Sequence, residues 1–226
     1  MISVAIDGPV GAGKSTVARE SAKRLGFIYA DTGALYRAIG LYAVRNGVED
    51  EKSEDYAEKV TALLPEITVE IKLENGTQKV FLCGEDVSGE IRQPKISMAA
   101  SAVSAIPAVR DFLLELQRSI ARESDVLMDG RDIGTVVLPS ADVKIFITAS
   151  PEIRARRRFE ELVNKGVETD FDQVLADLNR RDYQDSHRAV APLKMAEDAI
   201  LLDTSRLDFE ESVQSVVDLV RAATSA

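Results

Sequence analysis

One stretch near the start of the chain constrains its fold more than any other: Gly8-Pro9-Val10-Gly11-Ala12-Gly13-Lys14-Ser15-Thr16. It follows the apolar run 2–6 and leads into a segment with helical character, so it has the order of strand, glycine-rich loop and helix that defines a P-loop. The glycines let successive backbone N–H groups point inward around an anion, and the N-terminus of the following helix adds a partial positive charge. The stretch therefore predicts the binding of a nucleoside triphosphate.

Two side chains of this stretch have defined tasks in a P-loop. Lys14 would reach the β- and γ-phosphates, and the Ser15 hydroxyl would bind Mg²⁺. The alternatives are an ordinary glycine-rich turn and a dinucleotide-binding loop. The strand-to-helix context disfavours the first, and the second is weak because Thr16 stands where a third glycine would be expected.

Composition excludes several other classes of protein. The 226 residues suffice for a full core, as one domain with lobes or as two small domains. With 38 acidic and 28 basic residues, a net charge of −10 argues against a broad nucleic-acid-binding surface. No apolar run is long enough to cross a bilayer, and the N-terminus does not resemble a signal peptide. Since Cys83 is the only cysteine, no internal disulfide is possible, which fits a reducing, cytoplasmic compartment. Cys83 is expected to pack within the segment that surrounds it, and a monomer is expected because no hydrophobic seam between subunits is evident in the sequence.

Hydrophobic periodicity predicts strands that alternate with helices. The expected strands cover 2–6, 27–30, 126–128, 143–147 and 199–202, and the expected helices cover 17–23, 34–46, 93–102, 107–122, 151–165, 171–187 and 209–223. This order predicts an α/β fold with a central parallel sheet that helices cover on both faces. Ligands bind at the carboxyl ends of such strands, so the segments that begin at Gly8, Asp31, Asp129, Ala149 and Asp203 are expected to converge on one crevice.

A segment at about residues 65–88 has a different periodicity. Apolar residues alternate at Ile67, Val69 and Ile71, an Asn75-Gly76 turn follows, and residues 80–83 run back. A short helix that Ser53 caps precedes this segment. The segment is therefore predicted to be an antiparallel β insert within the α/β chain.

Arginines follow several of the predicted strands, although the protein is acidic. They are Arg37, Arg131, Arg154, Arg157, Arg158, Arg181 and Arg188, the last two seven residues apart on one helix with Asp185 between them. The spacing of Arg154, Arg157 and Arg158 predicts that these three share one helix face. Any one of them could be a solvated side chain or half of a surface ion pair worth little. Together with a P-loop, the set favours phosphoryl transfer, because forked guanidinium groups neutralise the charge of the transition state.

A second set of polar residues indicates a small acceptor substrate. Thr32, Arg37, Arg131 and Arg188 could hold one more phosphate, and Ser101, Arg110 and Asp132 could read the edge of a base. A GTPase switch, in contrast, orients water and needs few acceptor contacts.

Five motifs, in order along the chain, resemble those of the bacterial cytidylate kinases, which are P-loop nucleoside monophosphate kinases. The motifs are residues 8–16, Asp31-Thr32-Gly33-Ala34-Leu35-Tyr36-Arg37, Gly84-Glu85-Asp86-Val87-Ser88, Asp129-Gly130-Arg131-Asp132-Ile133-Gly134-Thr135 and Arg188-Ala189-Val190-Ala191-Pro192-Leu193. The resemblance covers essentially the whole chain. It implies transfer of the γ-phosphate of ATP to CMP or dCMP with Mg²⁺, giving ADP and CDP or dCDP, with small-molecule nucleotides as partners and neither nucleic acid nor membrane.

The resemblance also implies three moving parts. Residues 1–31, 123–150 and 167–226 would form the P-loop core. Residues 32–122 would form the lobe that binds the nucleoside monophosphate (NMP), including the β insert, and residues 151–166 would form a short helical lid.

Site residues follow by position from the resemblance. Those implied to bind ATP are Gly8, Pro9, Val10, Gly11, Ala12, Gly13, Lys14, Ser15, Thr16, Arg154, Arg157 and Arg158. Those implied to bind CMP are Thr32, Arg37, Ser101, Arg110, Arg131, Asp132, Arg181, Asp185 and Arg188, with Thr32 standing where the family often has serine. Lys14, Arg131, Arg157 and Arg188 are the implied catalytic residues.

Two carboxylates keep alternative interpretations. Asp129 either holds Mg²⁺ through water, beside Ser15 as the direct ligand, or orients Arg131. Asp7 either lies near Mg²⁺ or only begins the turn.

Two other functions are compatible with parts of the sequence. A P-loop kinase for another small molecule, such as shikimate or dephospho-coenzyme A, would share the loop and the lid but not the cytosine-type triad or the β insert. A nucleotide-dependent switch or binding module would leave the acceptor-side arginines without a task, and the chain has no N-K-x-D guanine signature.

Overall fold

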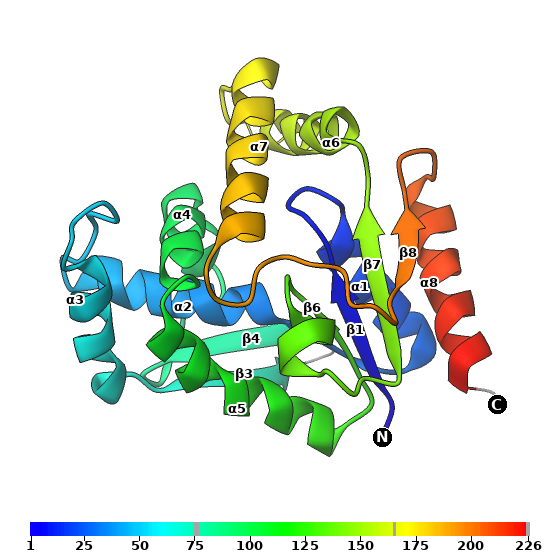
Figure 1. Cartoon of the computed structure of the whole chain (residues 1–226), viewed down its shortest axis with the longest axis horizontal. Coiled ribbons are helices and arrows are strands. Elements are labelled where there is room, and N and C mark those ends of the chain that lie inside the picture. Colours follow the sequence, from blue (N-terminus) through cyan, green and yellow to red (C-terminus); the bar gives the residue numbers. More distant parts are fainter. Residues whose placement is uncertain (75–76, 165, 225–226) are drawn as a thin grey trace. The chain divides into compact units, whose positions relative to one another are not determined.

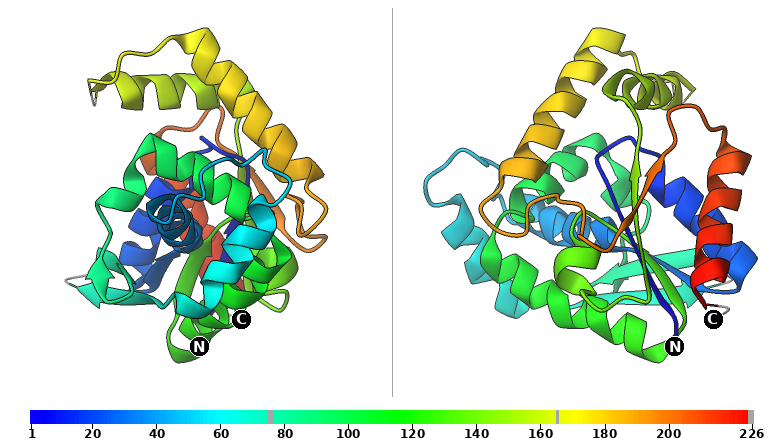
Figure 2. Two further views of the ribbon diagram at one scale, coloured as in Figure 1. Left: turned by 90° about the vertical axis from the view of Figure 1, so that its left-hand side faces the viewer. Right: turned by 45° about the vertical axis from the view of Figure 1, so that its right-hand side comes forward.

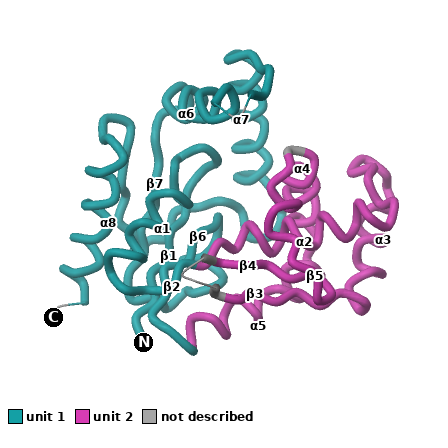
Figure 3. The backbone as a smooth tube through the Cα atoms, turned by 180° about the vertical axis from the view of Figure 1, so that it is seen from behind, with its two compact units in different colours: residues 1–29, 123–226 teal, residues 30–122 magenta. Residues whose placement is uncertain are grey.

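The computed structural model describes residues 1–74, 77–164 and 166–224. The chain forms two compact units, which Figure 3 colours separately. Unit 1 consists of residues 1–29 and 123–226, and unit 2 consists of residues 30–122.

A five-stranded parallel sheet organises unit 1 (Figure 1). Its strands are β1 (Ser3–Asp7), β2 (Ile28–Asp31), β6 (Val126–Asp129), β7 (Val143–Thr148) and β8 (Ile200–Asp203), in the spatial order β2-β6-β1-β7-β8. In the register of the sheet, Ile6 lies opposite both Asp129 of β6 and Ile145 of β7. The P-loop after β1 and the loop after β6 therefore leave the same edge of the sheet, as the sequence predicts.

Helices flank this sheet, which confirms the predicted fold class. Apolar residues of α1 (Lys14–Leu25) and α8 (Phe209–Thr224), such as Val17 and Val213, share one core with Ile6 and Ile145 of the sheet. Two further helices, α6 (Pro151–Asn164) and α7 (Phe171–His187), pack against each other around Ala155 and Leu178 (Figure 2). The loop after β6 forms one π-helical turn, η3 (Ile133–Val137).

Unit 2 has its own core, built by helices around a small antiparallel sheet. Its elements are α2 (Thr32–Arg45), α3 (Tyr56–Leu63), η1 (Leu64–Glu66), β3 (Val69–Glu74), β4 (Thr77–Leu82), β5 (Glu85–Asp86), η2 (Glu90–Arg92), α4 (Pro94–Val103) and most of α5 (Pro107–Glu123). The sheet order is β3-β4-β5, so the predicted hairpin is present. Its predicted turn at Asn75-Gly76 lies outside the described residues.

Two local predictions in unit 2 are wrong. Ser53 is not the cap of α3, because the N-cap position belongs to Asp55, and the Ser53 hydroxyl donates to the Asp55 carboxylate instead. Cys83 is exposed rather than packed, since it lies in the tight connection between β4 and β5 with a φ of 49°.

Among the described residues, no single helix is long and apolar enough to cross a membrane. Only α4 and α5 taken together reach that length and composition, and they meet at an angle of 97°.

We predict that Gly8→Ala lowers the free energy of unfolding by about 3 kcal/mol. Gly8 has a φ of 148°, and a Cβ atom there would overlap the backbone carbonyl oxygen of Ile147 on β7. Gly26→Ala is the matched control, because Gly26 also has a positive φ, of 76°, but an added Cβ would meet no atom within 4 Å. Urea denaturation followed by circular dichroism measures both variants, and equal losses of stability would contradict the steric explanation.

Candidate functional site

The P-loop connects β1 to α1 through three glycines with positive φ. These are Gly8, Gly11 and Gly13, with φ values of 148°, 74° and 81°. Such backbone angles are readily adopted only by glycine. The carbonyl oxygen of Gly13 accepts a hydrogen bond from the amide of Val17 at 3.0 Å, which starts the helix. The first turn of α1 therefore opens onto the loop, as anion binding requires.

Lys14 lies buried at the base of this loop. Its Nζ donates to the carbonyl oxygen of Pro9 at 2.7 Å, and only 4% of the residue is exposed. Burial and the positive charge of Arg131 lower the pKa of Lys14 from 10.5 to about 7. A polyphosphate beside Lys14 would favour its charged form, so this position suits an anionic ligand.

Ser15 and Asp129 form the part of the site that fits a magnesium ion. The Ser15 hydroxyl donates to Oδ2 of Asp129 at 2.7 Å, and the Tyr29 hydroxyl donates to Oδ1 of Asp129 at 2.9 Å. Asp129 ends β6 and is buried. A hydroxyl beside one carboxylate supplies few but hard oxygen ligands, which suits Mg²⁺ because it keeps waters and phosphate oxygens in its shell. The described residues contain no cluster of three or more histidine, cysteine or acidic side chains that could hold a metal by itself.

Asp7, at the end of β1, holds the loop that follows β6. Its two carboxylate oxygens accept hydrogen bonds from the backbone amides of Ile133 and Gly134, each at 2.7 Å. Burial raises the pKa of Asp7 from 3.8 to about 6, although both hydrogen bonds oppose this shift. Asp7 therefore fixes the start of the π-helical turn next to Arg131 and Asp132. The sequence left two interpretations for Asp7, a position near Mg²⁺ or a role in starting the turn. The structure adds a third, because Asp7 anchors the loop that follows β6.

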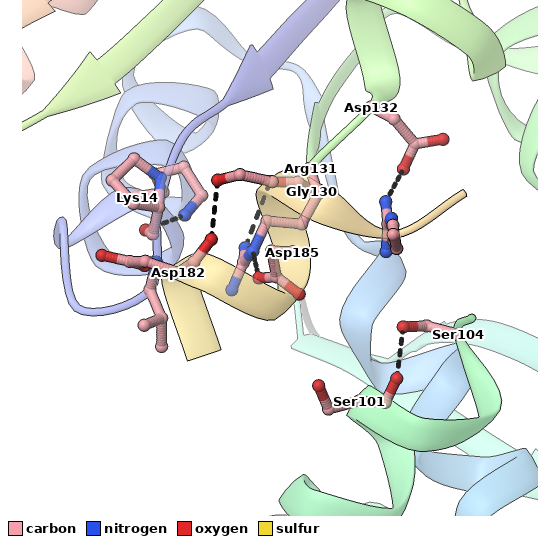
Figure 4. Close-up of polar contacts among 12 residues, drawn as sticks. Lys14, Ser101, Ser104, Gly130, Arg131, Asp132, Asp182 and Asp185 are labelled. Carbon is pink, nitrogen blue, oxygen red and sulfur yellow. Dashed lines mark hydrogen bonds and ion pairs between the residues drawn. The ribbon is translucent and has the colours of Figure 1, made fainter. Parts of the chain in front are cut away.

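Two arginines of unit 1 are held by carboxylates (Figure 4). The Nε of Arg131 donates to Oδ2 of Asp185 at 2.8 Å, and an Nη of Arg188 donates to Oδ1 of Asp132 at 3.2 Å. Asp132 and Asp185 are both buried. Arg188 does not lie on the late helix as predicted, because α7 ends at His187 and Arg188 is its C-cap in extended backbone.

The arginines of α6 occupy different environments. Arg157 donates to the carbonyl oxygen of Thr204 at 2.7 Å, and a Cβ atom on Gly13 would lie 3.9 Å from its Nη1, so Arg157 reaches the P-loop. Arg158 pairs with Glu161 on the surface, and Arg154 is buried with 4% exposure. The three arginines of one helical face therefore do not form one cluster. Arg181 of α7 is partly buried.

Unit 2 holds four of the predicted residues. The carboxylate of Asp31 accepts from an Nη of Arg37 at 2.7 Å and caps α2, and Thr32 beside it is buried. The Nε of Arg37 is buried and has no hydrogen-bond partner in the structure. An unsatisfied buried donor costs about 1–3 kcal/mol, so it marks a place where a ligand oxygen would be stabilising.

Ser101 and Arg110 lie near the junction of α4 and α5. An Nη of Arg110 donates to the carbonyl oxygen of Ser104 at 3.2 Å, and the Ser104 hydroxyl donates to the carbonyl oxygen of Ser101 at 2.8 Å. The guanidinium of Arg110 lies over the ring of Tyr36, 5.6 Å from its centroid. Figure 4 shows the contact between Ser101 and Ser104.

Sequence reasoning missed two residues that shape the site. Asp182 of α7 contacts Val10 of the P-loop and Arg154, and Thr204 after β8 binds Arg157. For Asp182, the position three residues before Asp185 was an available signal, because that spacing places both carboxylates on one helix face. Thr204 offered no comparable signal.

We predict that the backbone amide chemical shifts of Ile133 and Gly134 titrate with a midpoint near pH 6, since they report on Asp7. Because the folded-state pKa of Asp7 lies above its ordinary value of 3.8, the fold favours the protonated carboxyl. Its contribution to the free energy of unfolding, about 3 kcal/mol, is therefore present below pH 3.8 and lost as pH rises to about 6. An NMR pH titration of the labelled protein measures the midpoint. A midpoint at or below 3.8 contradicts the prediction, and Asp7→Asn should abolish the transition.

Comparisons with known proteins bear on the family of the chain. The crystal structure of a shikimate kinase from Bacteroides thetaiotaomicron matches with a TM-score of 0.46 and 14% identity, over 97% of this chain and 98% of that chain. A cytidylate kinase from Caldicellulosiruptor saccharolyticus is 49% identical over 218 residues, which are 96% of this chain and 95% of that protein. A cytidylate kinase from Caldanaerobacter subterraneus subsp. tengcongensis is 51% identical over 99% of this chain and 96% of its own length. The family model named cytidylate kinase matches residues 4–222, and the chain therefore belongs to the cytidylate kinase family.

Proposed function

We propose that this protein transfers the γ-phosphate of ATP to CMP or dCMP, giving ADP and CDP or dCDP. The observation that carries the proposal is the arrangement at one edge of the parallel sheet in unit 1. The P-loop leaves β1 there, and Arg131 and Asp132 leave the adjacent strand β6. A phosphate cradle and a set of guanidinium groups on neighbouring strands are the parts that transfer between two phosphorylated substrates needs.

The donor nucleotide is assigned to the P-loop, residues 8–16. The amides of the loop and the first turn of α1 would hold the phosphates, and Lys14 would reach the group that is transferred. Arg157 lies close enough to Gly13 to join them. Ser15 and Asp129 would hold Mg²⁺, which would supply positive charge to neutralise the phosphate oxygens.

The acceptor phosphate is assigned to four side chains: Thr32, Arg37, Arg131 and Arg188. Asp185, Asp132 and Asp31 each orient one of the arginines, so the planar forks are held before substrate binds. The buried Nε of Arg37 supports this assignment, because a ligand oxygen would supply the hydrogen-bond partner that it lacks. Arg181 and Asp185 are assigned to the ribose hydroxyls.

Cytosine recognition is assigned to Ser101, Arg110 and Asp132. Cytosine presents an amino donor together with ring-nitrogen and carbonyl acceptors, so an acid and basic or hydroxyl donors match its edge. An acid that faces the amino group of cytosine would face a carbonyl oxygen of uracil and repel it.

The reaction requires no covalent intermediate with the protein. An oxygen of the acceptor phosphate is already a nucleophile, so the protein aligns it with the γ-phosphate and neutralises the charge that spreads over the phosphoryl oxygens. Lys14, Arg131, Arg157 and Arg188 are the groups assigned to neutralise that charge.

We assign residues 151–166 to a lid and residues 32–122 to an NMP lobe. Closure of the lid and the lobe would exclude water and so prevent hydrolysis of ATP. The protein is taken to act as a cytoplasmic monomer.

Turnover with different acceptors tests the function directly. ADP formation is measured from ATP and Mg²⁺ with CMP, dCMP, UMP, AMP or no acceptor. We expect rapid turnover with CMP and dCMP and little with the others. Turnover with none of them, while ATP still binds, would refute the cytosine assignment and leave only the P-loop. Gel filtration at assay concentration tests the monomer.

Kinetics of three alanine variants test the assigned roles. Lys14→Ala and Arg131→Ala should each lower kcat at least about a hundredfold, because each removes charge stabilisation that is greatest in the transition state. Ser101→Ala should raise the KM for CMP about tenfold with little change in kcat, because its contact is made equally in ground and transition states. Lys95→Ala, at an exposed position on another face of the same helix, is the control and should leave both constants unchanged. Full turnover in Arg131→Ala would overturn the acceptor-phosphate assignment.

A further inference from the structure

We propose that Asp182 is a positioning residue that joins the donor-phosphate loop to the acceptor-side Arg131 through one turn of α7. The inference rests on the proposed function, because it assigns ATP to the P-loop and the CMP phosphate to Arg131. Asp182 would contact neither nucleotide. It would act by holding Arg154 and the backbone of Val10.

Asp182 makes its contacts where α7 approaches the P-loop. Its Oδ1 accepts from the backbone amide of Val10 at 3.3 Å, and its Oδ2 accepts from Nη1 of Arg154 at 2.6 Å. The same Nη1 donates to the carbonyl oxygen of Val10 at 2.9 Å. The backbone amide and the carbonyl oxygen of Val10 are thus both held by one ion pair, whose partners come from α6 and α7. Figure 4 shows Asp182 and Lys14 among the polar contacts of this region.

The ion pair between Asp182 and Arg154 differs from the exposed pairs of the same helices. The side chain of Arg154 is 5% exposed and that of Asp182 is 20% exposed. Arg154 also donates from Nε to the carbonyl oxygen of Ala149, at the end of β7, at 2.9 Å. A charge-assisted bond between largely buried partners is stronger than a surface pair, and loss of one partner leaves a buried charge unmatched.

Packing around Gly11 independently shows how closely the helices approach the loop. A Cβ atom at Gly11 would lie 3.0 Å from Cδ1 of Leu178 on α7 and 3.3 Å from Cβ of Arg154 on α6. Since protein interiors transmit strain rather than absorb it, a displacement of the P-loop would move both helices. A triphosphate that fills the loop would therefore affect α7.

Asp185 connects the same helix to the acceptor side. It lies three residues after Asp182, on the same helix face, and its Oδ2 accepts from Nε of Arg131 at 2.8 Å. The turn of α7 between these aspartates thus joins Arg154 and Val10 to Arg131, and all of these residues belong to unit 1. Because this turn is one rigid element, order imposed at Asp182 favours the position of Asp185 that holds Arg131.

A functional consequence follows from this connection. Binding of ATP should increase the affinity for CMP, and by linkage CMP should increase the affinity for ATP by the same factor. We expect a factor of about five or more in the wild-type protein. Asp182→Asn should reduce it to about one, because an amide in place of the carboxylate no longer neutralises Arg154.

Calorimetric titration measures this factor. The Kd of CMP is determined for the full chain with Mg²⁺, first alone and then with the β,γ-imido analogue of ATP at saturation. For Asp182→Asn we expect the Kd of CMP alone to stay within about twofold of the wild-type value, while the effect of the analogue disappears. In steady-state assays the variant should show a KM for ATP about tenfold higher, with a smaller change in kcat.

Asp177→Asn is the matched control, since it makes the same substitution five residues earlier on α7. Asp177 forms an exposed pair with Arg180 at 3.0 Å, so this variant should keep the wild-type factor. If Asp182→Asn does not fold, Arg154→Lys replaces it in the test, because it keeps the positive charge and removes the fork that bridges Asp182 and Val10. A purely structural role would change the melting temperature without changing the ratio of the two Kd values.

Each possible result of these measurements is decisive. Loss of the factor in Asp182→Asn but not in Asp177→Asn supports the inference. An unchanged factor in Asp182→Asn, or no factor in the wild-type protein, overturns it. Absence of CMP turnover in the wild-type protein would instead refute the proposed function, so the two failures can be told apart.

Discussion

Buried charge at the carboxyl edge of the parallel sheet is the constraint on which the rest of this structure depends. Lys14, Asp7, Asp129 and Asp132 are all nearly inaccessible to water, and each such group is stable there only with a matched partner. The partners come from different elements: a loop carbonyl for Lys14, backbone amides for Asp7, hydroxyls for Asp129 and a guanidinium for Asp132. These contacts fix the loops after β1 and β6, so the requirement to satisfy buried charge and the requirement to position the site are met together.

The arginine–carboxylate pairs also reduce the entropy cost of binding a phosphate. A free arginine side chain loses conformational freedom when it binds phosphate, and a fork already held by a carboxylate has lost much of it during folding. Asp185 holds Arg131 through Nε, and one Nη of Arg131 donates to the carbonyl oxygen of Gly130 at 3.2 Å. Asp31 holds Arg37 through one Nη, while the Nε of Arg37 stays without a partner. The carboxylate therefore orients each guanidinium without occupying every donor, which is the condition for binding a second anion.

Local sequence signals predicted the elements well because each signal acts within a few residues. Gly47, in left-handed backbone, ends α2 close to the predicted boundary, and Pro107 starts α5 as expected. The P-loop was predicted for the same reason.

The environments of Arg154 and Arg188 were not predictable in this way. Helical spacing grouped Arg154 with Arg157 and Arg158, but its partners Val10 and Asp182 lie 144 and 28 residues away and are brought to it only by tertiary packing. The prediction for Ser53 failed for a different, local reason: Asp55, two residues further on, occupies the N-cap position of α3.

The distribution of charge explains how an acidic chain can still bind small polyanions. At physiological ionic strength the field of exposed charges is screened within about 8 Å, so the net charge of −10 acts mainly on ligands that extend over the surface. A nucleic acid would meet that acidic surface along its length. A mononucleotide would instead meet only the groups within one screening length of its phosphates, where Lys14, Arg131 and Arg157 gather around the P-loop in a poorly screened setting. The acidic surface and the local basic groups thus act together, because they favour small nucleotides over polymers that carry the same phosphate chemistry.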